Sequence, residues 1–318
     1  MAEKFATGEA LNETIQFALN RWGTVLRFGW APMALVLAIS LGLAWAIFDV
    51  KALEAAEDNP EVIFQFDQYL KMALSAAIML GIAGSILISF ILAGFMASVY
   101  RLVALGEERP GFVHLRFDGP AQRVFIANLI LSLINMVLYA AAFFVASLTT
   151  GVSPGDAFGA IGEFFTVVGQ AAEAGDQFDP TGVGDTIAPI GLFFVAGLFA
   201  MLPMIYVNIR LAPFLAGSAA ENRLLLLGSL RLTAGNFWGL FLYFLLLIIV
   251  MMVIAFVFQL VIGIVDALSG LPSNGVFALF GYIASAIGFI ATVAYQLFIY
   301  AIQFGGQGVV YRRLKTGG

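Results

Sequence analysis

Six long apolar runs without a single charged residue constrain this chain more than any other feature. None of them contains Asp, Glu, Lys, Arg or His. About 20 apolar residues in a helix cross the hydrocarbon core of a bilayer. The sequence therefore predicts an all-α, polytopic membrane protein whose six transmembrane helices form three hairpins in a single membrane domain over residues 1–318. The expected spans are 30–48, 72–99, 124–148, 187–207, 237–265 and 275–304.

Composition supports this class. The chain is 61% hydrophobic and 11% charged, whereas a soluble domain has about 45–50% apolar and about 25% charged residues. It has no cysteine and one histidine, His114. Disulfides, thiolate metal sites, cysteine nucleophiles and His-rich metal clusters are therefore excluded.

The basic residues are distributed unequally between the two sides of the predicted membrane domain. Of the 15 Lys and Arg residues, all except Lys51 and Lys71 fall in segments on one side. Short cytoplasmic loops are enriched in Lys and Arg. We therefore expect both termini to face the cytoplasm.

Three segments outside the spans are expected to carry structure. Residues 5–22 have an apolar face at helical spacing, which predicts an amphipathic helix that lies on the inner leaflet or binds a partner. The outer loop 149–185 is too long to be a bare connection and contains an expected short helix. Pro32 is expected in the first turn of the first span, and Pro203 is expected to kink the fourth.

The segment Ile209–Phe241 predicts a second surface helix that ends where the fifth span begins. Leu224, Leu227 and Leu230 recur at helical spacing beside Arg223 and Arg231. Gly235 is expected to end this helix in a left-handed turn, and Asn236 to cap the next helix. Leu-Arg pairs at residues 26, 115 and 230 each precede a span. Either a threefold repeat of one hairpin or the positive-inside rule alone explains this pattern.

The apolar spans offer few groups that could perform chemistry. Ionisable residues inside spans usually mark ion pathways and proton relays, so their absence argues against an ion-coupled transporter and an intramembrane hydrolase. No G-x-x-x-x-G-K-[ST], G-x-S-x-G or H-E-x-x-H motif is present. We therefore expect no catalytic residue, no cofactor and no metal site.

Two sets of residues remain as site candidates. Polar residues within or beside the spans either hydrogen-bond between helices or line a cavity for an amphiphile; the cavity candidates are Asn135, Asn208 and Gln296. Basic residues beside amphipathic stretches suit the anionic head groups of membrane lipids on the cytoplasmic face; these candidates are Arg116, Arg223 and Arg231. A protein partner or a homo-oligomer is left open, and no nucleic acid is expected.

The segment Ile209–Phe241 resembles the membrane domain of bacterial glycerophosphoryl diester phosphodiesterases and of related stand-alone six-span membrane proteins. The resemblance is carried by Arg210, Ala212-Pro213, Glu221, Ser229, Leu232-Thr233 and Gly235-Asn236-Phe237-Trp238. Those enzymes carry a separate soluble catalytic barrel, for which this chain has no room, so no catalytic residue is implied. The resemblance implies a stand-alone membrane module in a bacterial inner membrane.

These observations favour a non-enzymatic inner-membrane protein with a lipid-binding or membrane-organising role. The alternative is a permease for an uncharged or amphiphilic small molecule. A lipid-modifying enzyme is a third hypothesis. A continuous polar cavity at the three amide residues would favour the permease, whereas lipid bound beside the three arginines would favour the first hypothesis.

Overall fold

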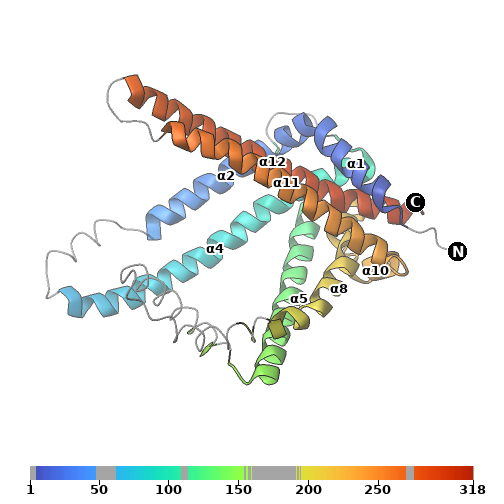
Figure 1. Cartoon of the computed structure of the whole chain (residues 1–318), viewed down its shortest axis with the longest axis horizontal. Helices are drawn as coiled ribbons and strands as arrows, with labels where there is room; N and C mark the ends of the chain where they lie inside the picture. Colours follow the sequence, from blue (N-terminus) through green and yellow to red (C-terminus); the bar gives the residue numbers. More distant parts are fainter. Residues whose placement is uncertain are drawn as a thin grey trace, which may run out of the picture. The chain divides into compact units, whose positions relative to one another are not determined.

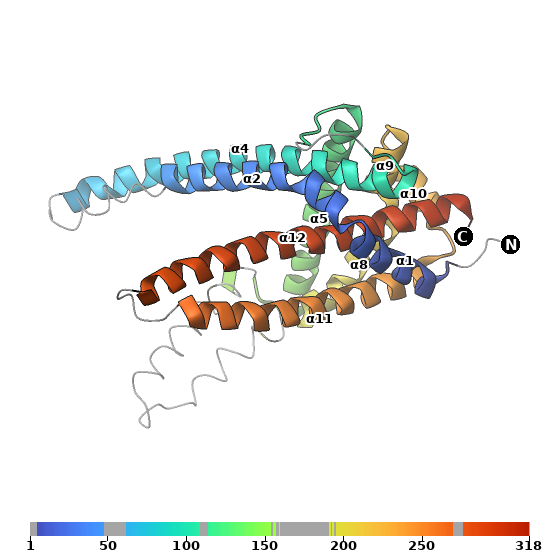
Figure 2. The ribbon, with the colours of Figure 1, turned by 90° about the horizontal axis from the view of Figure 1, so that it is seen from above.

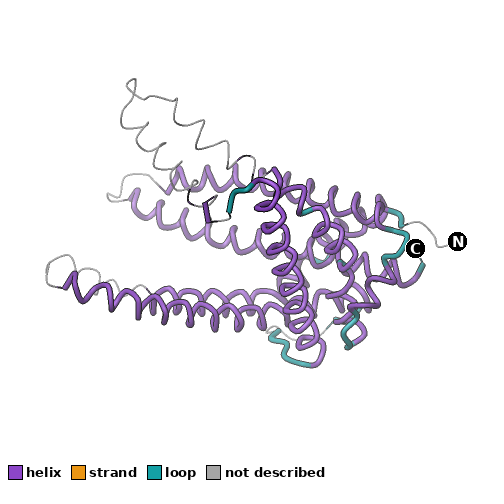
Figure 3. Tube along the Cα trace, turned by 90° about the horizontal axis from the view of Figure 1, so that it is seen from below, coloured by secondary structure: helices purple, strands orange, loops and turns teal. Residues whose placement is uncertain are grey.

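A computed structural model describes residues 5–47, 62–108, 114–153, 195–269 and 276–317, with a few single positions between 155 and 193. The described part of the chain consists of helices and loops, with no strand (Figure 3). In lipid every backbone N–H and C=O must be paired within the segment, which a helix achieves. The helices are α1 (Thr7–Asn20), α2 (Trp22–Ile47), α4 (Val62–Leu105), α5 (Gly119–Thr150), α8 (Leu202–Leu211), α9 (Pro213–Glu221), α10 (Leu226–Leu232), α11 (Phe237–Ser269) and α12 (Val276–Thr316).

Six helical stretches among the described residues are long and apolar enough to cross a membrane. Each overlaps one of the expected spans, so the prediction of an all-helical, multi-pass membrane protein is confirmed. The stretches are Trp22–Leu43, Gly81–Leu105, Gly119–Thr150, Val195–Glu221, Phe237–Val265 and Gly281–Thr316. In the most apolar part of each stretch, at most half of the residues are buried inside the protein. Apolar side chains that protein leaves uncovered to this extent are typical of helices that face lipid.

The chain divides into two compact units. The first unit comprises Met1–Asn128 and Ala212–Gly318, and the second comprises Leu129–Leu211. In the first unit α2 runs beside α4, and α11 beside α12, as Figure 1 and Figure 2 both show. Helix α12 also packs against α1, α2, α4 and α9. It is therefore the central helix of this unit.

Three glycines explain how α12 accommodates so many neighbours. Gly305 lies against the ring of Phe17 on α1, Gly306 against the hydroxyl of Tyr243 on α11, and Gly308 against Val103 on α4. A Cβ atom at these positions would come within 2.6–2.9 Å of those side chains. The absence of side chains on one part of α12 therefore lets three helices approach it closely.

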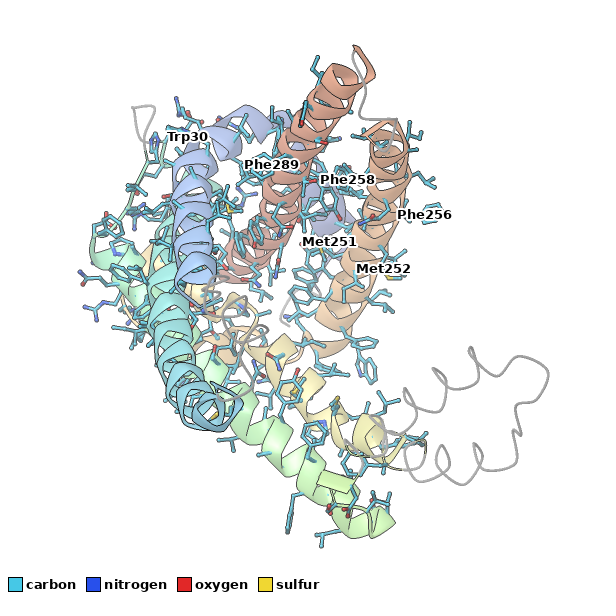
Figure 4. The ribbon with its side chains drawn as sticks, turned by 90° about the vertical axis from the view of Figure 1, so that its left-hand side faces the viewer. Trp30, Met251, Met252, Phe256, Phe258 and Phe289 are labelled. Atoms are coloured by element: carbon cyan, nitrogen blue, oxygen red, sulfur yellow. The ribbon has the colours of Figure 1, made fainter. Side chains whose placement is uncertain are left out.

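The last hairpin shows how its side chains divide between protein and lipid. Phe258 on α11 stacks on Tyr295 of α12 with ring centroids 4.0 Å apart. Met252 and Phe256 are about two-thirds exposed, and Figure 4 shows Phe256 pointing away from α12. Helix α11 therefore presents one aromatic face to its partner helix and another apolar face outward.

In the second unit, the third and fourth spans contact each other. Asn208 Nδ2 donates a hydrogen bond to Asn135 Oδ1 at 2.7 Å. Phe143 and the buried Phe193 stack with ring centroids 6.1 Å apart. Among the described residues, an amide pair and an aromatic pair thus connect these two spans.

The N-terminal region differs from its prediction. Helix α1 ends at Asn20, and α2 begins at Trp22, which is eight residues before the expected start of the first span. Pro32 consequently lies in the interior of α2 rather than in a first turn. The reason is packing, because Val25 and Phe28, on the extended part of α2, are fully buried in the first unit.

Helix α1 packs against protein with one face. Ala10, Thr14 and Ala18 are buried, and the helix contacts α11 and α12. The apolar face predicted for this helix consists of Leu11, Ile15, Ala18 and Trp22; Ala18 is buried in this contact, and the other three are half-buried. Whether α1 also lies on the inner leaflet or binds a partner protein stays a prediction.

The segment Ile209–Phe241 forms two short helices, α9 and α10, rather than one surface helix. Asn222, with φ 51°, ends α9 in a left-handed conformation. Every residue from Pro213 to Ala219 is buried, and α9 packs against α4 and α12. The expected left-handed turn at Gly235 is confirmed by its φ of 82°.

Two further predictions concern Pro203 in the fourth span and the outer loop 149–185. In the fourth span the residue before α8, Met201, is a turn residue, but the helical hydrogen bonds continue across it: Met201 N donates to the Gly197 carbonyl at 2.9 Å, and Ile205 N to the Met201 carbonyl at 3.1 Å. Pro203 therefore lies inside the helical stretch Val195–Glu221, and the expected kink at this residue stays a prediction. At the expected start of the short helix in the outer loop 149–185, Gly155 and Asp156 are helical, and Ser153 Oγ accepts a hydrogen bond from Asp156 N at 3.1 Å. Most of the rest of this loop lies outside the described residues.

Candidate functional site

Ion pairs in the described part of the first unit form four separate groups. They join α1 to the end of α12, the residue after α1 to the segment after α4, the C-terminal end of α4 to the segment before α5, and the end of α9 to the end of α12. Their members are Glu9, Glu13, Arg21, Arg101, Glu107, Glu108, Arg116, Asp118, Glu221, Arg223, Arg312, Arg313 and Lys315. We call these residues together the charged layer.

The charged layer attaches α1 to the end of α12. Arg313 Nε donates to Glu13 Oε2 at 2.8 Å, and Arg313 Nη1 to Glu9 Oε2 at 3.0 Å. Arg312 also forms an ion pair with Glu13. Figure 1 and Figure 2 show α1 lying along the C-terminal part of α12. The basic end of the chain therefore neutralises the acidic face of the amphipathic helix.

Arg116, one of the predicted lipid contacts, lies inside the charged layer. Its Nε donates to Asp118 Oδ1 at 2.6 Å, Nη1 is 3.7 Å from Glu107 Oε1, and the side chain is only 5% exposed. Gly94 on α4 touches the backbone carbonyl of Arg116. The absence of a side chain at Gly94 lets this segment dock, and docking buries the guanidinium.

Arg223 and Arg231, the other two predicted contacts, lie at the surface. Arg223 donates to Glu221 Oε2 at 2.8 and 2.6 Å, yet its side chain is 70% exposed. Arg231 is in the last turn of α10 and is exposed. Leu227 and Trp238 are 69% and 76% exposed. We call the exposed side chains of this segment the interfacial patch; they are Arg223, Leu224, Leu227, Arg231 and Trp238.

The structure brings together two of the three polar residues that the sequence singles out for a cavity. Asn208 Nδ2 bonds to Asn135 Oδ1 and also donates to the Met204 carbonyl at 2.9 Å. Gln296 is half-buried on α12 in the first unit. The bond between Asn135 and Asn208 matches the interpretation of interhelical hydrogen bonding. The permease hypothesis stays a prediction.

A cavity of about 200 Å³ opens where α1, α4 and α12 meet. It is lined by Glu13, Phe17, Arg21, Leu102, Val103, Gly106, Val309 and Arg312. Its three charged members were not among the site residues predicted from the sequence. A signal was present, since Glu9 and Glu13 lie on one face of a helix and Arg312-Arg313 ends the last span. About 300 residues separate this acidic pair from this basic pair, so their positions in the sequence give no indication that they meet in the fold.

The charged layer offers groups that can bind a ligand. No group of three or more His, Asp or Glu residues in the described ranges is placed to hold a metal ion. Guanidinium and carboxylate groups beside apolar walls can bind charged head groups through ion pairs and hydrogen bonds. Comparisons with family models, curated proteins and solved structures give no match to this chain.

Proposed function

We propose that this multi-pass membrane protein is a non-enzymatic component of the bacterial inner membrane. In this proposal it binds anionic lipid head groups of the cytoplasmic leaflet through the interfacial patch. The observation that carries the proposal is the exposure of Leu227 and Trp238 beside two arginines. An apolar surface next to basic groups is typical of segments that lie at the boundary between head groups and acyl chains.

The energetics favour this location for the patch. Each Lys or Arg near an anionic leaflet contributes about 1 kcal/mol to binding. Burial of a leucine side chain contributes about 1.5–3 kcal/mol more. Tryptophan is enriched at this depth because its ring is apolar and its N–H is polar. The expected lipid contact at Arg116 has no part in the proposal, since that guanidinium already binds Asp118 and is nearly fully covered.

The cytoplasmic orientation has support from charge and from packing. All but two of the Lys and Arg residues belong to segments on one predicted side. The ion pairs between α1 and the end of α12 require these two parts of the chain to lie on the same side of the membrane. Six spans, an even number, would also place the two ends of the chain on the same side of the membrane. The positive-inside rule then assigns that side to the cytoplasm.

The test measures how much phosphatidylglycerol the purified full-length protein retains, by native mass spectrometry against a phosphatidylcholine background. The double variant Arg223→Gln/Arg231→Gln should retain about 25-fold less phosphatidylglycerol, because two contacts of about 1 kcal/mol each are lost. Lysine at both positions should restore most of the retention. Arg123→Gln, which removes an exposed arginine outside the patch, is the matched control. Unchanged retention in the double glutamine variant would contradict the proposal.

The resemblance of Ile209–Phe241 to phosphodiesterase membrane domains stays a hypothesis, and the proposal does not depend on it. What supports a lipid-related role is the placement of this segment. Its first part, α9, is buried between α4 and α12, and its second part carries the interfacial patch. The patch is thereby held close to α4 and α12 of the first unit.

A further inference from the structure

The cavity between α1, α4 and α12 is separate from the interfacial patch and combines both signs of charge with an apolar wall. Glu13 and Arg312 face each other in it as an ion pair, and Arg21 pairs with Glu108 at its edge. Arg313 also pairs with Glu13 and with Glu9, so three guanidinium groups are balanced by three carboxylates at and around the cavity. A balanced site of this kind disfavours a polyanion and favours a ligand that carries one positive and one negative group.

The charged groups retain the capacity to bind such a ligand. A guanidinium has five N–H donors. Arg21 uses Nη1 for Glu108, so a phosphate oxygen can bind other donors of Arg21 while that ion pair remains. A carboxylate accepts about four hydrogen bonds. Glu13 Oε2 accepts from Arg313 at 2.8 Å, and Oε1 pairs with Arg312, so an ammonium group can share this carboxylate.

The size and walls of the cavity suit the head group of a lipid rather than a complete drug-sized molecule. Pockets for drug-sized molecules have volumes of about 300–1,000 Å³, whereas this cavity has about 200 Å³. Phe17, Leu102 and Val309 supply most of its apolar wall. Leu105, next to the lining residue Gly106, is exposed. This exposed leucine at the end of α4 offers an apolar contact for an acyl chain whose head group lies in the cavity.

We propose that this cavity binds the head group of a zwitterionic phospholipid with a primary ammonium, as in phosphatidylethanolamine. The phosphate binds Arg21 and Arg312, and the ammonium donates hydrogen bonds to Glu13. The trimethylammonium group of phosphatidylcholine has no N–H to donate, so the site discriminates between these two lipids. This inference concerns different residues from the interfacial patch and does not rest on the proposed function.

The test is a competition between 1-palmitoyl-2-oleoyl phosphatidylethanolamine and the phosphatidylcholine with the same chains, added in equal amounts to the purified full-length protein. Native mass spectrometry gives the ratio of the two lipids retained. The wild type should retain phosphatidylethanolamine at least fivefold over phosphatidylcholine. Arg21→Gln should reduce retention of both lipids, because both carry the phosphate. Arg123→Gln, outside the cavity, should leave the amounts and the ratio unchanged.

Glu13→Gln separates recognition from a structural role. It keeps the shape of the side chain but removes the charge, so the preference for phosphatidylethanolamine should fall to about onefold while phosphatidylcholine is still retained. Lys315→Gln, which breaks the ion pair with Glu221 elsewhere in the charged layer, should leave the ratio unchanged. Equal retention of the two lipids by the wild type would overturn the proposal. So would a ratio that Glu13→Gln does not change.

A final arm distinguishes the intact lipid from its free head group. Phosphoethanolamine is added in millimolar excess to the protein loaded with phosphatidylethanolamine. Displacement of the lipid assigns the site to the head group alone, and retention of the lipid shows that the acyl chains contribute to binding. The Arg223→Gln/Arg231→Gln variant should keep the wild-type preference for phosphatidylethanolamine even where it has lost phosphatidylglycerol. Failure of one lipid proposal is thereby separated from failure of the other.

Discussion

At the scale of single residues, Thr14 and Tyr243 form the most specific polar contact between α1 and α11. Both are fully buried, and their hydroxyl oxygens are 2.7 Å apart. Thr14 Oγ1 also donates to the Ala10 carbonyl at 2.9 Å. Because a hydroxyl has one proton, Tyr243 is the donor and Thr14 the acceptor in the bond between them. Without this bond the Tyr243 hydroxyl would lose its acceptor, whereas Thr14 would keep its bond to the Ala10 carbonyl.

This inequality leads to a prediction for two single variants. Thr14→Val leaves the buried Tyr243 hydroxyl without its acceptor and should destabilise the protein by about 1–3 kcal/mol. Tyr243→Phe removes only the donor, while Thr14 still bonds to Ala10, and should cost about 0.6–1.5 kcal/mol. The double variant should lose less stability than the sum of the two. Unfolding of the detergent-solubilised protein, followed by circular dichroism, measures all three. A larger loss for Tyr243→Phe than for Thr14→Val would show that the donor assignment is wrong.

At the scale of elements, α1 is fixed at both ends. Near its start, Asn236 Oδ1 accepts a hydrogen bond from Phe5 N, and Thr7 Oγ1 donates to the Gly239 carbonyl, each at 3.0 Å. Glu13, at the middle of α1, pairs with Arg312 and Arg313, and Arg21, directly after α1, pairs with Glu108. The expected cap Asn236 thus holds α1 to the start of α11. The helix joins the two ends of the last hairpin.

The approach of α1, α11 and α12 depends on Gly306. A Cβ there would lie 2.6 Å from Tyr243 Oη and 3.4 Å from Thr14 Cγ2, and both side chains are fully buried. Gly306→Ala should therefore destabilise the protein by about 1–3 kcal/mol through overpacking. Gly263→Ala on α11 meets nothing within 4 Å and should leave stability unchanged or raise it by up to about 1 kcal/mol. Thermal unfolding in detergent measures both. A lower melting temperature for Gly263→Ala than for Gly306→Ala would contradict this packing argument.

The sequence predicts some elements well and others poorly, for physical reasons. The spans are predictable because lack of charge over about 20 residues is a local property. The turn at Gly235 is also local, since only a residue without a Cβ adopts a positive φ freely. The burial of Arg116 depends on Gly94 of another helix, and the cavity depends on residues from both ends of the chain. Such contacts between distant segments leave no periodic signal.

At the scale of the whole molecule, the described residues form an all-helical protein with six apolar helical stretches that can cross a membrane. In the first unit the ion-paired side chains belong to α1 and to the chain around the ends of α4, α9 and α12. The interfacial patch follows α9 directly. The cavity and the patch thus both belong to the part of this unit that contains the charged layer. The threefold hairpin pattern of the sequence stays a prediction.

The central claim is that this charged part of the protein faces the cytoplasm. Because the chain has no cysteine, single cysteines can be labelled with a membrane-impermeant maleimide without background. Gly8→Cys and Thr316→Cys should be labelled in inverted membrane vesicles and protected in spheroplasts. Asp58→Cys and Ser273→Cys, in the predicted outer loops, should show the opposite behaviour. Labelling of Gly8→Cys or Thr316→Cys in spheroplasts would contradict the claim, and with it the assignment of both lipid sites to the cytoplasmic leaflet.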